Sequence, residues 1–133
     1  MSHLPDLSLN GRHALVCGAS AGIGRATALT LAAMGAHVTV LARRSDRLAT
    51  LVSEIEAAGG TAGALIADLD ERSGLGERID ALIEERGPVH ILINNSGGPP
   101  GGPLLKAGEE ELLTAMGRHL FASHLMVQRC VPG

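Results

Sequence analysis

The most informative segment of the chain is ALVCGASAGIG, residues 14–24, where a short apolar run leads into three closely spaced glycines. Residues 14–17 have the length of a buried strand, and an alanine- and leucine-rich helical segment follows from Ile23 to Met34. At the N-terminus of such a helix the backbone amides point outward, the helix dipole favours an anion, and glycine lets the backbone approach it closely. The segment therefore predicts a phosphate-binding turn. Three ordinary turn glycines, in a chain that has 18, are the alternative.

The rest of the chain alternates between short apolar runs and amphipathic segments. Three further strands are expected at residues 37–42, 61–66 and 90–93. Three further helices are expected at 45–58, from about 75 to a break at 87–88, and at about 109–128. The last helix would carry four apolar residues on one side, namely Leu113, Met116, Leu120 and Phe121. Strand–helix alternation of this kind predicts a single α/β domain over residues 1–133, with a doubly wound parallel sheet covered by helices on both faces.

Composition argues against several kinds of partner and location. The net charge is −3 and the eleven lysines and arginines are scattered, so neither nucleic acid nor an anionic membrane is expected as a partner. No apolar stretch is long enough to span a bilayer, and residues 1–10 lack the pattern of a secretion signal. Cys17 and Cys130 are interpreted as free packing thiols in a reducing compartment. The protein is therefore expected to be cytoplasmic.

Polar residues follow each of the later strands. Arg43 and Arg44 stand where dinucleotide-binding folds usually carry an acidic residue for the ribose 2′-hydroxyl, and guanidinium groups there favour a 2′-phosphate. This indicates NADP(H) rather than NAD(H), unless both arginines are simply solvated residues at the start of the next helix. Asp68, followed by Leu69, is suited either to the adenine amino group or to a helix N-cap. Residues 94–97, Asn-Asn-Ser-Gly, have the chemistry of a turn beside a ribose.

These motifs, in this order, resemble the N-terminal half of the short-chain dehydrogenase/reductase family, particularly its 3-oxoacyl-carrier-protein-reductase-like members. The family's Thr-Gly-x3-Gly-Ile-Gly is matched by residues 17–24, its Asp-Leu by residues 68–69 and its Asn-Asn-Ala-Gly by residues 94–97. The resemblance implies a Rossmann-type fold and a set of cofactor-binding residues. The pyrophosphate would be bound by Gly18, Ser20, Ala21, Gly22, Ile23 and Gly24, and the 2′-phosphate by Arg43 and Arg44. Adenine would contact Asp68 and Leu69, and the nicotinamide ribose would contact Asn95, Ser96 and Gly97.

The chain departs from this family in its catalytic residues. The family uses a serine and a Tyr-x3-Lys pair located after the fifth strand, but this chain has no tyrosine and a single lysine, Lys106. We therefore expect a partial domain, truncated after the fourth strand and the following helix, with the catalytic C-terminal half absent. The fourth strand would then be an apolar edge, which is an aggregation hazard, so self-association is expected. The resemblance itself implies a homotetramer or a dimer formed through the last helices.

Two substitutions fall within the family's motifs. Cys17 replaces a threonine, and His119 stands where the family carries an asparagine that supports a proton-relay water. His119 could take part in proton transfer, or it could be a packing or half-exposed histidine. His119 and His124 are five residues apart, about 140° around a helix, so no metal site is expected from them.

The function expected from the sequence is an NADP(H)-dependent oxidoreductase acting on a carbonyl or alcohol substrate, represented by its cofactor-binding half. The alternative is a non-catalytic dinucleotide-binding or interaction protein derived from the same family. A methyltransferase also uses a glycine-rich first turn, but it would want an acidic residue where this chain has Arg43.

Overall fold

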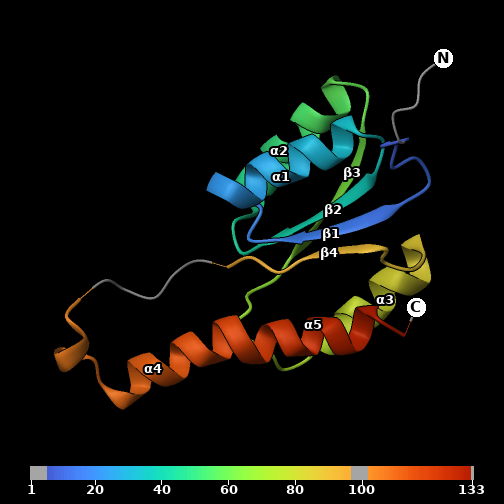
Figure 1. The fold of residues 1–133 in the computed structure, drawn as a ribbon. Helices are drawn as coiled ribbons and strands as arrows, with labels where there is room; N and C mark the ends of the chain where they lie inside the picture. The colour runs from blue at the N-terminus through green and yellow to red at the C-terminus, as the bar shows by residue number, and fades with distance from the viewer. Residues whose placement is uncertain (1–5, 97–101, 133) are drawn as a thin grey trace.

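The structure is a computed structural model that describes residues 6–96 and 102–132. Strands and helices alternate along the chain as the apolar pattern predicted (Figure 1). In order they are β1 (His13–Cys17), α1 (Gly22–Ala33), β2 (His37–Ala42), α2 (Ser45–Ala57), β3 (Thr61–Ile66), α3 (Leu75–Arg86), β4 (Ile91–Ile93), a short 3-10 helix η1 (Leu104–Lys106), α4 (Glu109–Met116), a π-helical turn η2 (Gly117–Phe121) and α5 (Ala122–Cys130).

The four strands form one parallel sheet in the order β3-β2-β1-β4. The chain moves from β1 to β2 and β3 on one side, then returns to place β4 on the other side of β1. The predicted doubly wound, Rossmann-type sheet is therefore confirmed. Within the described residues β4 is an edge strand, as expected, and its residues are half-buried.

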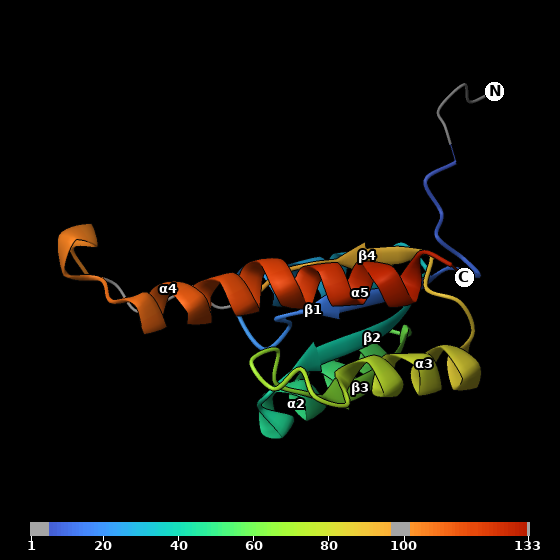
Figure 2. The ribbon, with the colours of Figure 1, turned by 90° about the horizontal axis from the view of Figure 1, so that it is seen from below.

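Helices cover both faces of the sheet (Figures 1 and 2), and an apolar cluster lies on each face. α1 and α2 lie on one face, where Val16, Val38 and Val40 point toward them. α3 and α5 lie on the other face, where Leu15 and Leu41 pack with the apolar sides of these helices. Because β1 and β2 are buried on both faces, they read in the sequence as continuous apolar runs.

The last helical region differs most from its prediction. It was expected to be one helix over about 109–128, but the π-helical turn η2 interrupts it and α5 continues to Cys130. The apolar side chains expected to share one face are about half exposed: Leu113 (54%), Met116 (46%), Leu120 (55%) and Phe121 (46%). The residues of this region that enter the core are instead Ala122, Met126 and Cys130. Across the described ranges, none of the helices combines the length and the apolar character that crossing a membrane requires.

Candidate functional site

A cavity of about 380 Å³ opens at the carboxyl ends of the strands. It lies where β1 separates β2 from β4, the point at which open parallel sheets bind their ligands, because the loops on either side diverge there. Nearly all the predicted cofactor-binding residues line it: Gly18, Ser20, Ala21, Gly22, Ile23, Arg43, Arg44, Asp68, Leu69, Asn95 and Ser96. Of the others, Gly24 is buried behind the turn, and Gly97 falls outside the described residues.

Each glycine of the turn meets a different requirement. Gly18 has a φ of 62° and is packed so closely that an added Cβ would lie 2.6 Å from the carbonyl oxygen of Asn95. Gly24 brings α1 against the turn, since a Cβ there would overlap the Gly18 carbonyl oxygen. Gly22 has a φ of 59° but open space around it, so it serves backbone conformation alone. Asn95 holds β4 to the turn by donating from Nδ2 to the Gly18 carbonyl oxygen at 3.3 Å.

The turn leaves a row of amides without partners in the described fold, and four of the residues that carry them, 20–23, line the cavity. Ala19 N–H donates to Leu41 O at 3.2 Å, whereas the N–H groups of residues 20–24 donate to no atom of the described chain. Ala21, the N-cap of α1, makes no side-chain capping bond, and the first turn of α1 holds no acidic side chain. Unpaired amides at a helix N-terminus attract an anion through both hydrogen bonding and the helix dipole. This geometry suits a phosphate, and the assignment of these residues to a pyrophosphate stays a prediction.

The two arginines after β2 have different local roles. Arg44 is the N-cap residue of α2 and its Nε lies 4.0 Å from an Asp46 carboxylate oxygen, so for Arg44 the helix-start interpretation also holds. Arg43 precedes the helix, and no ion pair involves it among the residues described. Both guanidinium groups are exposed beside the cavity and are available to an anionic group there.

Asp68 is not a helix N-cap, because α3 begins at Leu75 and its N-cap is Gly74. Its Oδ1 accepts a hydrogen bond from the Asp70 N–H at 2.9 Å, and its carbonyl oxygen accepts one from Glu71 N–H at 2.9 Å. Asp68 therefore closes a tight turn just after β3, and the residue lines the cavity, where the adenine prediction places it.

Arg118 also lines this cavity and was not predicted from the sequence. It comes from η2, and its guanidinium is paired with the Asp70 carboxylate through Nε (3.0 Å) and Nη2 (2.6 Å). The hydrogen bond from Arg118 lowers the pKa of Asp70 below its ordinary value. The sequence does place this arginine beside the family's asparagine position, at residue 119. No local pattern, however, connects residue 118 with residue 70, so the ion pair could not be predicted.

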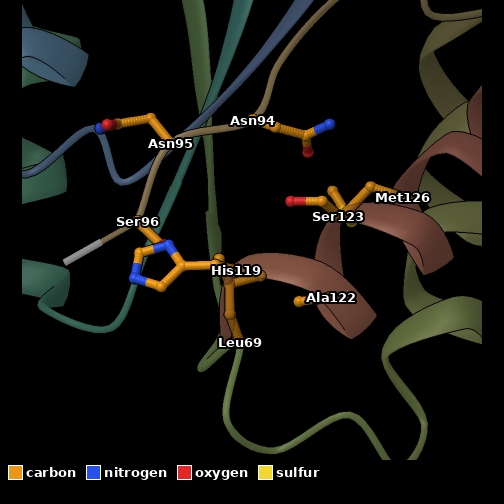
Figure 3. A pocket seen from close by; sticks show the side chains of 8 residues that line it. All are labelled: Leu69, Asn94, Asn95, Ser96, His119, Ala122, Ser123 and Met126. Atoms are coloured by element: carbon orange, nitrogen blue, oxygen red, sulfur yellow. The ribbon is translucent and has the colours of Figure 1, made fainter. Parts of the chain in front are cut away.

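A smaller cavity of about 230 Å³ adjoins the first and shares Leu69, Asn95 and Ser96 with it. Figure 3 shows His119 beside Ser96 at this cavity, with Ser123 of α5 also lining it. Ser96 Oγ and His119 Nδ1 are hydrogen-bonded at 2.9 Å, and the imidazole is exposed. His119 is therefore exposed rather than a core histidine, and it is tethered to the segment after β4; a part in proton transfer stays a prediction.

The remaining reactive groups belong to the core. Cys17 and Cys130 are free and buried, as predicted. Burial, followed by the neighbouring Cys130, raises the pKa of the Cys17 thiol to about 12, so it stays protonated and inert. Over residues 6–96 and 102–132 no three His, Cys, Asp or Glu side chains are grouped as metal ligands.

Comparison with known proteins agrees with this geometry. A profile of the short chain dehydrogenase family matches residues 12–133. The chain belongs to the short-chain dehydrogenase family. It is 43% identical over 102 residues to a short chain dehydrogenase of Pseudocercospora fijiensis, covering 77% of this chain and 33% of that protein. It is 40% identical over 103 residues to the 7alpha-hydroxysteroid dehydrogenase of Escherichia coli, covering 77% and 40%.

A solved structure of the same family shows the same fold. The 3-oxoacyl (acyl-carrier-protein) reductase from Agrobacterium tumefaciens, crystallised with NADP bound, has a TM-score of 0.86 and 35% identity to this chain. The alignment covers 95% of this short-chain dehydrogenase chain and 50% of the reductase. The chain thus spans half or less of the length of these relatives.

Proposed function

We propose that this short-chain dehydrogenase chain binds NADP(H) in the larger cavity and forms the cofactor-binding part of an oxidoreductase for a carbonyl or alcohol substrate. The observation that carries the proposal is that residues 20–23, whose backbone amides have no partner in the described chain, line the same cavity as Arg43. The amides suit a diphosphate, and the arginine suits a third phosphate at the 2′ position. The NADP in the Agrobacterium tumefaciens reductase structure supports this cofactor.

The chain's own residues would hold and orient the dinucleotide. The residue 18–24 turn would bind the diphosphate, Asp68 would accept from the adenine amino group, and Asn95 and Ser96 would lie against the second ribose. The bound nicotinamide supplies or accepts a hydride. The substrate class rests on the relatives' names, which describe a hydroxysteroid dehydrogenase and a 3-oxoacyl reductase.

Replacement of Arg43 tests the cofactor assignment. Arg43→Ala should weaken NADPH binding about 10- to 100-fold, since charge-assisted bonds to a phosphate each contribute roughly 1.5–3 kcal/mol, and it should leave NADH binding unchanged. Titration of the nucleotide fluorescence measures both affinities. Arg47→Ala is the matched control, because Arg47 is an exposed arginine of the same run that does not line the cavity. Equal binding of NADH and NADPH by the unmodified protein would remove Arg43 from this role.

A dinucleotide-binding protein without catalysis is the second candidate, because the 133 residues contain no tyrosine to act as the family's acid. The two candidates differ in turnover. NADPH oxidation in the presence of 3-oxoacyl or steroid ketones supports the oxidoreductase, whereas binding without oxidation across such substrates supports the second candidate. An intact mass of the native protein accompanies the assay and shows which residues were tested.

We also propose a cytoplasmic location and self-association. The free, buried thiols suit a reducing compartment. Leu113, Leu120 and Phe121 are half-exposed apolar residues of α4 and η2 that a second molecule could cover. A monodisperse monomer in light scattering at tens of micromolar would contradict self-association.

A further inference from the structure

Arg118 occupies an unusual position in the cavity wall. It lies in η2, 48 residues from its partner Asp70, which follows β3. Two parallel hydrogen bonds join the guanidinium to the carboxylate, and the two side chains are only 19% and 30% exposed. A bidentate pair of this kind fixes the orientation of the guanidinium plane as well as its distance.

A second arginine ties the same two segments from the opposite direction. Arg72, in the loop after β3, lies 5.8 Å from the centre of the Phe121 ring in η2 and donates to Leu69 O at 3.3 Å. Gly117 leaves room for it, since an added Cβ would lie 2.8 Å from Arg72 Nη1. The loop and η2 are therefore held together by reciprocal arginine contacts, and Arg118 is placed rigidly beside the cavity.

The pairing determines what Arg118 can offer a ligand. Its Nε and Nη2 edge is occupied by Asp70, and that carboxylate compensates its charge. The hydrogen bond from Arg118 depresses the pKa of Asp70, so the carboxylate stays ionised at neutral pH. Arg43 differs from Arg118 in its pairing: it is exposed and forms no ion pair within the described residues. A neutralised guanidinium is poorly suited to a phosphate, but its flat face can still stack on an aromatic ring.

We propose that Arg118 is a cofactor-binding residue whose guanidinium plane, held by Asp70, stacks on the adenine ring and stabilises NADPH and NADH equally. The inference rests on the proposed function, because it needs a dinucleotide in the larger cavity. It assigns affinity for the base to Arg118 and preference for the 2′-phosphate to Arg43. Asp68 and Arg118 would then meet the same base, one at its amino group and the other at its face.

The experiment compares nucleotide affinities of Arg118→Met, which keeps an unbranched apolar stem and removes the planar group. Both NADPH and NADH should bind about 5- to 30-fold more weakly, with their ratio unchanged, as expected for loss of one stacking contact with a base. ADP, which retains adenine and the diphosphate, should weaken by the same factor. Arg129→Met is the matched control: Arg129 belongs to α5 and pairs with Asp80 of α3, away from the cavity, so affinity should not change.

The outcomes separate this inference from the proposed function. Failure of the unmodified protein to bind either nucleotide overturns both. Normal binding by Arg118→Met overturns only the role of Arg118, and a loss confined to NADPH makes Arg118 a phosphate ligand and overturns stacking. Asp70→Asn provides a second variant that keeps an oxygen for Arg118 but removes the compensating charge. It should raise the preference for NADPH over NADH, and an unchanged ratio would contradict the charge argument.

Discussion

The two ends of the parallel sheet differ in whether their polar groups have hydrogen-bond partners within the fold. At the carboxyl end, the amides of residues 20–24 donate to no described atom and Arg43 is exposed beside the cavity. At the amino end, polar side chains are paired within the fold, and two of them, His13 and Thr39, are buried. His13 is 4% exposed, its Nδ1 donates to Gly87 O at 3.2 Å, and its Nε2 accepts from the hydroxyl of the fully buried Thr39 at 2.8 Å.

The network at the amino end extends to neighbouring strands and to α3. His90 Nδ1 accepts the His13 N–H at 2.9 Å, and His37 Nε2 accepts from Arg86 Nη1 at 3.2 Å. No buried side-chain nitrogen or oxygen in the described part of the chain lacks a partner. Hydrogen bonds completed within the fold contribute to stability, whereas donors left open serve a ligand. Removing a paired polar group at the amino end should therefore alter stability, and removing an open donor at the carboxyl end should alter binding.

The largest expected effect comes from the crowded glycine of the turn. Gly18→Ala and Gly22→Ala both place alanine at a left-handed position, but only Gly18 is packed against Asn95. Gly18→Ala should therefore lose about 1–3 kcal/mol more unfolding free energy than Gly22→Ala, the cost of overpacking. Urea denaturation of the two variants measures the difference. Equal destabilisation would mean that the contact with Asn95 does not constrain the turn.

At the amino end, His13→Val should cost about 1–3 kcal/mol of unfolding free energy, because the Thr39 hydroxyl and the Gly87 carbonyl lose their partner. Adding Thr39→Val removes one of these orphaned groups and should restore part of the loss. NADPH affinity should remain that of the unmodified protein in both variants. Weaker nucleotide binding at unchanged stability would contradict the separation between the two ends.

The smallest effect expected is a dependence of stability on pH. Burial lowers the pKa of His13 and of His37 below the ordinary value of 6.5. The unfolded chain therefore takes up protons near pH 6.5 that the folded chain does not, so stability is complete above that value and falls as the pH drops below it. Thermal melts between about pH 8 and pH 5 should show this decline, and His13→Val should make it shallower. A flat profile in the unmodified protein would contradict burial of neutral histidines.

Much of the sheet could be predicted because its strands are local patterns. The strands expected at residues 37–42 and 61–66 coincide with β2 and β3, while β1 and β4 each differ by one residue at the start. The last helix was predicted less well. Helical spacing identifies which residues share a side, but not whether that side has a neighbour. Its expected apolar face stayed half exposed, and Met126 and Cys130 entered the core instead.

The candidate site also has a part that the sequence predicted and a part that it did not. Residues following β1, β2, β3 and β4 could be predicted to meet, because the carboxyl ends of parallel strands gather at one edge of the sheet. Their positions around one cavity agree with that expectation, and their binding roles remain to be tested. Short-range patterns were sufficient for this because each motif adjoins its own strand. The pairing of Arg118 with Asp70 and the burial of His13 against Thr39 needed the folded chain, since these contacts join segments that only packing brings together.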